Sequence, residues 1–163
     1  MDARRHVLSV MVENEPGVLS HVAGLFSGRG FNIESLNVAP TLEEGVSLMT
    51  ITTTGDEAII EQIIKQLRKL VVAIKVVDLT EVKAVEREMM FLKIHADDAH
   101  RADILRISDV FRGKVVDVGP DELTVEVTGD HGKLTAFITL MQRFGVKEVA
   151  RSGTLAIKRS MQD

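Results

Sequence analysis

The chain has 163 residues, of which 45% are hydrophobic, and it contains no cysteine. Two halves of roughly 80 residues would each bury too small a share of their surface to be very stable alone, so mutual packing or dimerisation is expected. Its 20 basic and 24 acidic side chains give a net charge of −4, which argues against nucleic acid or a membrane surface as a partner. Without cysteines there is neither a disulfide framework nor a thiolate metal site, and the N-terminal apolar stretch is too short for a signal peptide, so we expect a cytoplasmic protein.

The first half, residues 4–80, has the pattern of one βαββαβ unit. Alternating apolar residues predict a strand over 6–12 with both faces partly covered. Apolar residues at helical spacing then predict a helix of about three turns from Val18 to the glycines at 28 and 30. The rest of this half is predicted as strands over 33–40 and 46–54 joined by an acidic hairpin loop, a helix from Asp56 with an apolar stripe reaching Val71, and a strand over 73–80.

The second half repeats this order after a charged linker at 81–88, which gives a second domain over 89–160. Arg29-Gly30 and Arg112-Gly113 each follow the first helix of their half, in register with the repeat. The predicted elements are a strand over 89–95, a helical stripe from Ile104 to Phe111, strands over 114–118 and 123–128, a helical stripe from Leu134 to Phe144, and a strand over 146–157 bulged at Gly153.

This element order predicts an α+β fold made of two ferredoxin-like domains. Each domain would have a four-stranded antiparallel sheet with two helices on one face. The other face carries apolar side chains and has no cover of its own. We therefore expect a homodimer in which sheet faces pack or sheet edges join.

Catalytic and metal-binding patterns are missing from the sequence. The residues from His95 to His100 crowd two histidines and two aspartates together, but we favour Asp97 and Asp98 as the residues that begin and cap a helix. Asp130 is predicted to begin the last long helix in the same way. Base stacking on a sheet would need aromatic residues on the strands, whereas four of the six phenylalanines lie on helical stripes or at helix ends. We predict no catalytic residue, no metal ligand and no cofactor site in this chain.

The segment between the first strand and the first helix, residues 13–20, has a composition suited to an amino-acid ligand. A helix N-terminus offers free N–H groups to a carboxylate, and Gly17 lets a ligand approach the backbone. Asn14 can both donate to a carboxylate and accept from an ammonium group. The same residues also suit an ordinary turn, with Pro16 at the first helical position and Asn14 near the cap.

Several segments resemble the regulatory small subunit of acetolactate synthase (acetohydroxyacid synthase), whose N-terminal half is an ACT domain. The segments span nearly the whole chain, and they are VENEPGVLSHVAGLFSGRGFNIESLNVAPT (12–41), GDEAIIEQIIKQLRKLV (55–71), VEREM (85–89), FRGKVVDV (111–118) and EVARSG (148–153). The glycine-containing turn is shared by ACT domains in general, whereas the series from VEREM through FRG to VARSG is specific to this subunit.

The resemblance implies a subunit without catalytic activity that activates a separate large catalytic subunit and mediates feedback inhibition by valine or another branched-chain amino acid. Thiamine diphosphate, magnesium and FAD would sit on the large subunit. The effector would lie between two ACT domains of a homodimer. By motif, the matching positions are Asn14, Gly17, Val18 and Ser20 in the loop and helix start, and Asn32 and Ile33 on the facing strand.

The chain departs from the family pattern at Leu48, where many members have arginine, and in the preceding loop at 42–45. These differences bear on effector response or on contacts to the catalytic subunit. An alternative function is a free-standing ACT amino-acid sensor that regulates a different enzyme. An acylphosphatase-like enzyme would need a basic, glycine-rich phosphate cradle after the first strand, and the acidic loop there argues against it.

Overall fold

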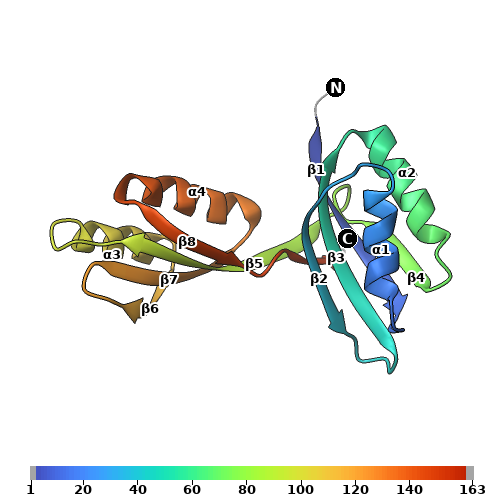
Figure 1. Cartoon of the computed structure of the whole chain (residues 1–163), viewed down its shortest axis with the longest axis horizontal. Helices are drawn as coiled ribbons and strands as arrows, with labels where there is room; N and C mark the ends of the chain where they lie inside the picture. Colours follow the sequence, from blue (N-terminus) through green and yellow to red (C-terminus); the bar gives the residue numbers. More distant parts are fainter. Residues whose placement is uncertain (1–2, 161–163) are drawn as a thin grey trace. The chain divides into compact units, whose positions relative to one another are not determined.

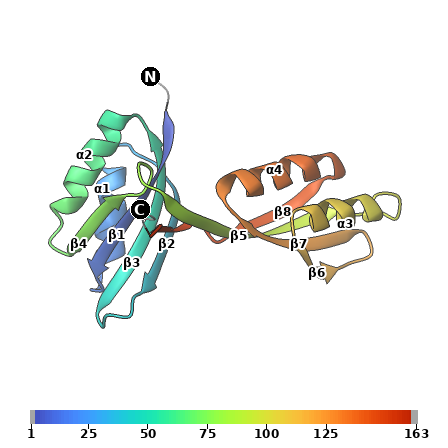
Figure 2. The ribbon, with the colours of Figure 1, turned by 180° about the vertical axis from the view of Figure 1, so that it is seen from behind.

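The computed structural model describes residues 3–160, which form nine strands, four α-helices and one 3-10 helix. Contacts divide these residues into two units, one made of 3–85 with 154–160 and the other of 86–153. Each unit contains a βαββαβ arrangement in which two helices cover one face of an antiparallel sheet (Figures 1 and 2). The predicted α+β fold of two ferredoxin-like halves is therefore confirmed.

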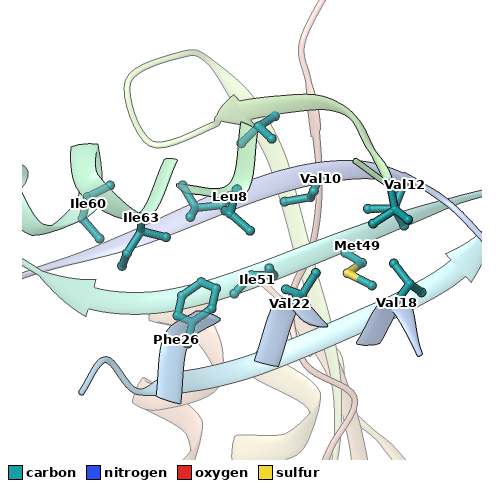
Figure 3. Close-up of a cluster of buried hydrophobic side chains, with 13 residues drawn as sticks. Leu8, Val10, Val12, Val18, Val22, Phe26, Met49, Ile51, Ile60 and Ile63 are labelled. Carbon is teal, nitrogen blue, oxygen red and sulfur yellow. The ribbon is translucent and has the colours of Figure 1, made fainter. Parts of the chain in front are cut away.

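The first unit is built on a sheet with strand order β2-β3-β1-β4. Apolar residues at every second strand position point toward the helices, so Leu8, Val10 and Val12 pack against Val22 and Phe26 in a fully buried cluster (Figure 3). Burial of this kind stabilises by about 25 cal/mol for each Å² of apolar surface. The elements are β1 (Arg4–Glu13), α1 (Val18–Ser27), β2 (Ile33–Pro40), β3 (Val46–Gly55), α2 (Glu57–Arg68) and β4 (Ala73–Asp78).

The second unit has its own core and strand order β6-β7-β5-β8. Met90, Leu92 and Ile94 face the helices, where Phe137 packs against Phe111 at a ring-centroid distance of 5.3 Å. The elements are β5 (Ala84–His95), α3 (Arg101–Val110), β6 (Lys114–Val118), β7 (Glu122–Gly129), α4 (His131–Met141), η1 (Gln142–Phe144) and β8 (Val146–Arg151).

The C-terminal segment returns to the first unit instead of extending β8. Gly153 has φ 82°, which breaks the strand predicted over 146–157, and β9 (Leu155–Lys158) pairs with β5. Asn37 Nδ2 donates to the Thr154 carbonyl at 3.1 Å, and Ala156 packs with Val7 and Leu79. The chain itself therefore covers part of the sheet face that we expected to lie open. The segment predicted as a linker over 81–88 likewise contains the start of β5.

Two apolar stripes are shorter than the sequence pattern indicates. Helix α2 ends at Arg68, so Val71 lies beyond it and is 96% exposed. Val110 ends α3 and is also exposed, as is Leu105 in part. Helical spacing identified the elements but could not say at which turn each helix stops.

Helices α1 and α3 end in the same Schellman motif, with different residues at the left-handed position. After α1 this position is Gly30, at φ 70°, and the Phe31 N–H donates to the Phe26 carbonyl. After α3 it is Arg112, at φ 56°, and the Gly113 N–H donates to the Ser108 carbonyl at 2.7 Å. Gly30 therefore corresponds to Arg112, so the two Arg-Gly pairs are one residue out of register, contrary to the sequence prediction.

Within residues 3–160, no helix combines the length and the apolar character needed to cross a bilayer.

Candidate effector site

The loop between β1 and α1 is held at its base by main-chain hydrogen bonds. The Asn14 N–H donates to the Gly45 carbonyl at 2.7 Å, and the Glu13 N–H donates to the Val72 carbonyl at 2.8 Å. The loop ends at Gly17, the N-cap of α1, with φ 85° and ψ 0°. This left-handed conformation favours glycine, so the helix begins at Val18 and the alternative start at Pro16 is wrong.

The first turn of α1 leaves backbone donors open. The Val18 N–H donates to the Glu15 carbonyl at 3.2 Å, and the His21 N–H donates to Gly17 at 3.0 Å. Among the residues that the structure describes, the N–H groups of Leu19 and Ser20 have no acceptor. No side chain caps this helix, and its first turn contains no acidic residue. A free helix N-terminus of this kind suits a carboxylate.

The other three helices provide a carboxylate at the same place. Asp56 accepts from the Ile59 N–H at the start of α2, and Asp130 accepts from the Lys133 N–H at the start of α4. The predicted role of Asp130 is thereby confirmed. Helix α3 has Asp103 in its first turn and Asp97 just before it. Within the described residues, α1 is thus the helix with no acidic residue at its N-cap or in its first turn, although Glu15 lies two residues before the cap.

The predicted residues of the loop and helix start differ in what they can offer a ligand. Asn14, Gly17 and Ser20 are exposed at this end of the unit. Val18 is buried, and its side chain points into the core (Figure 3). Since its N–H is also paired, Val18 positions the turn and presents no free group. Sequence reasoning missed Leu19, which has an open N–H and a side chain that is 47% exposed.

Asn32 and Ile33 lie at the opposite end of the same sheet. Ile33 pairs with Thr53 on β3, and the Asn32 carbonyl accepts from Thr53 Oγ1 at 2.7 Å. Glu13, beside the loop, pairs with Val46 at the other end of β3. Seven residues of strand separate these two positions, which is about 23 Å. One copy of the chain therefore does not bring the two predicted groups together.

The equivalent loop of the second unit is closed by its own side chains. Asp97 Oδ1 accepts from the His100 N–H at 2.9 Å and lies 2.7 Å from His100 Nδ1, and the hydrogen bond to the His100 side chain lowers the pKa of Asp97. Arg101 Nη2 donates to the carbonyls of Ala96, Gly119 and Pro120. Asp97 thus caps the turn before α3, although the helix itself begins three residues later than Asp98. Nowhere in residues 3–160 do three or more histidine or acidic side chains gather as a metal site would require.

Two of the sequence motifs in the second half meet across β5 and β8. Glu88 is buried and forms an ion pair with Arg151. The Met89 N–H donates to Ser152 Oγ, and the Ser152 N–H donates to the Met89 carbonyl, both at 3.0 Å. An ion pair and two hydrogen bonds therefore join the VEREM and VARSG motifs, which are distant in sequence.

Comparisons with known proteins match both halves of the chain. Residues 87–160 match the family model described as the small subunit of acetolactate synthase, and residues 8–75 match that of the AHAS small subunit-like ACT domain. The acetolactate synthase small subunit of Aquifex aeolicus is 50% identical over 97% of this chain and 83% of its own length. The chain belongs to the acetolactate synthase small subunit family.

Further relatives support the assignment to this family. A probable acetolactate synthase small subunit from Archaeoglobus fulgidus is 49% identical over 95% of this chain and 97% of its own length. The crystal structure of the Thermotoga maritima small subunit superposes with a TM-score of 0.85 at 41% identity, covering 98% of this chain and 99% of that one. The resemblance predicted from the motifs is therefore confirmed over both units.

Leu48, which departs from the family motif in the sequence, lies on the sheet face away from α1 and α2. It pairs with Met11 on β1 and Ala39 on β2, and it is half-buried. Leu48 therefore adds apolar surface to this face of the sheet.

Proposed function

We propose that the chain is a regulatory subunit that activates the large catalytic subunit of acetolactate synthase and makes it sensitive to valine. Relatives of nearly the same length are named small subunits of this enzyme, which supports a partnership with a catalytic chain. In this proposal the catalytic chain holds thiamine diphosphate, magnesium and FAD, and it joins the two 2-oxo acids. The present chain supplies a response to the end product.

The observation that carries the effector site is the position of β2 at the edge of its sheet. Pro40, at the end of β2, pairs with Ser47 and lies at the same end of the sheet as the loop before α1, whereas Ile33 lies at the other end. If two copies join β2 to β2 in antiparallel fashion about a two-fold axis, Ile33 of one copy comes to the loop of the other. The homodimer would then assemble both groups twice.

The chemistry of the loop suits an α-amino acid. The carboxylate would accept from the open N–H groups of Leu19 and Ser20, and the Asn14 carboxamide oxygen would accept from the ammonium group. Ile33 of the second copy would contact the apolar side chain. An effector that binds one dimer conformation more tightly shifts the equilibrium between conformations and so changes how the dimer binds the catalytic subunit. The coupling free energy between two such sites is typically ~1–3 kcal/mol.

Reconstitution with the catalytic subunit from the same source tests this function. The purified chain should form no acetolactate from pyruvate with all cofactors present, whereas adding it to the large subunit should raise activity and introduce inhibition by valine. Sedimentation should show a dimer at micromolar concentration. Turnover by the chain alone, or a large subunit that responds neither in rate nor in valine sensitivity, would contradict the proposal.

A further inference from the structure

The second unit contains a pocket of about 460 Å³ that the proposed effector response does not use. It lies where β5, β6 and β7 meet the end of α3 and the start of α4. Four cationic and two acidic side chains line it, which gives a net charge of +2, and these residues are Arg87, Arg112, Lys114, Lys133, Glu126 and Asp130. A volume of this size suits a small molecule.

Two of the four cations have no partner of their own. Arg112 and Lys114 form no ion pair and no side-chain hydrogen bond with any described residue. Lys114 sits directly across from Glu126 in the ladder between β6 and β7, yet their charged groups do not come within ion-pair distance. Both side chains are exposed, and an excess of one sign of charge along a concave surface attracts a ligand of the opposite sign.

The backbone at Arg112 indicates that its side chain is placed there for more than the fold. Arg112 occupies the left-handed position of the Schellman motif, and it is the one non-glycine residue with positive φ in the described chain. The first unit has Gly30 at the equivalent position. The fold therefore accepts glycine here, and backbone strain at a non-glycine residue is commonly retained at functional sites.

Lys133 and Asp130 are held in defined positions beside the pocket. The Lys133 Nζ donates to the Thr128 carbonyl at 2.9 Å, and the stem of the side chain lies so close over Gly129 that a Cβ at that glycine would overlap it. Asp130 is engaged as the cap of α4, where it accepts from the Lys133 N–H at 2.8 Å. The Asp130 carboxylate is therefore already used within the fold. The Lys133 ammonium group donates one hydrogen bond to the backbone and retains further N–H donors for a ligand.

We propose that this pocket binds a small molecule through a phosphate dianion. The charge of a phosphate monoester near pH 7, about −1.5 to −2, balances the net charge of the lining residues. Planar guanidinium groups pair with two phosphate oxygens at once, and lysines add point charges. The proposed amino-acid effector, a zwitterion without net charge, does not match the charge of this pocket, so we expect a different ligand here.

Isothermal titration of the full chain with inorganic phosphate, at constant ionic strength in KCl, tests the site. We expect a dissociation constant at or below about 1 mM for the wild type. Arg112→Gly should weaken binding about tenfold or more, and without phosphate its midpoint of thermal unfolding should equal or exceed that of the wild type. Lys114→Gln should weaken binding several-fold. Titration with glycerol 3-phosphate distinguishes free phosphate from a phosphate ester as the ligand. Tighter binding of the ester than of inorganic phosphate would identify a phosphorylated metabolite.

Arg106→Gln is the matched control, because Arg106 lies on α3 outside the pocket, is 77% exposed and pairs with Asp103. This variant loses the same charge and should bind phosphate like the wild type. The proposal fails if Arg106→Gln weakens binding as much as Arg112→Gly, or if the wild type does not bind millimolar phosphate. A lower unfolding midpoint for Arg112→Gly would also overturn it, since Arg112 would then serve the fold.

Discussion

The helices α1 and α3 follow the first strand of their own βαββαβ unit, and their N-termini differ in charge. Before α3, Asp97 accepts from the His100 N–H, and Asp103 lies in the first turn. Before α1, the N-cap is Gly17, and no carboxylate caps the helix or lies in its first turn. Among the described residues, both helix starts leave the N–H groups of their second and third residues without an acceptor, but only the α3 start has an acidic side chain in its first turn.

Under the proposed function, this difference assigns a structural role to one helix start and a ligand-binding role to the other. A helix N-terminus is stabilised by negative charge, which can come from the chain or from a bound molecule. In the second unit the chain supplies it permanently. In the first unit an effector would supply it under the proposed function, and the space around Gly17 is open.

Replacing Gly17 should have the largest effect on this difference. Gly17→Asp puts a carboxylate beside the open N–H groups, so it should act as a built-in competitor and repel the effector's carboxylate. We expect the valine midpoint of the reconstituted enzyme to rise about tenfold or more above that of Gly17→Asn, the matched neutral variant.

Both variants place a side chain at φ 85° with open space around it. Aspartate and asparagine tolerate this conformation better than most residues, so each should lower the free energy of unfolding by only ~1 kcal/mol. Because Gly17 is the N-cap of α1, the new side chain would stand before the first helical turn and not within it. Equal valine midpoints for Gly17→Asp and Gly17→Asn would show that charge at this position is irrelevant to the effector.

Asn14→Ala should have a smaller effect on the same readout. The side chain is exposed and makes no hydrogen bond with a described residue, while its main-chain N–H keeps its bond to Gly45. Stability should therefore change by less than ~0.5 kcal/mol. Loss of one hydrogen bond to the ammonium group should raise the valine midpoint several-fold. Inhibition curves that coincide with the wild type would remove Asn14 from the site.

Asp97→Asn, in the second unit, should have the smallest effect and none on valine. Because the pKa of Asp97 is lowered in the folded protein, its ionised form contributes stability above the ordinary value of 3.8, and that contribution is lost as the pH falls through the folded pKa. The variant should unfold at most a few degrees below the wild type near pH 7, and the two melting temperatures should converge below pH 4. A difference in melting temperature that persists at pH 2 would show that the substitution acts through packing and not through charge.

The fold could be predicted well because the spacing of apolar residues and the residues that begin or end each element are local features of the sequence. Alternation in β1 and the stripe of α2 appear directly in the order of residues, and the aspartates that cap α2 and α4 precede their helices as capping rules require. The return of the C-terminal segment was not predictable, since it depends on Thr154 and Ala156 meeting β1 and β2, more than a hundred residues away.

The candidate site was predictable in its residue types and not in its geometry. The positive φ of Gly17 and the burial of Val18 follow from where α1 starts, and sequence signals place a helix start only within a few residues. The separation of Asn14 from Ile33 follows from the strand register, which pairing across β3 determines. The positive φ of Arg112 could not be predicted, because arginine in a sequence does not indicate left-handed backbone.

The most direct test of the difference between the two units is a valine titration of the full chain, followed by backbone amide chemical shifts. Our account predicts saturable shifts of the Leu19 and Ser20 resonances, with those of Ala102 and Asp103, at the equivalent turn of α3, unchanged. Shifts at both helix starts, or at the α3 start alone, would contradict this prediction, because the lack of an acidic side chain at the α1 start would then not be what selects the effector.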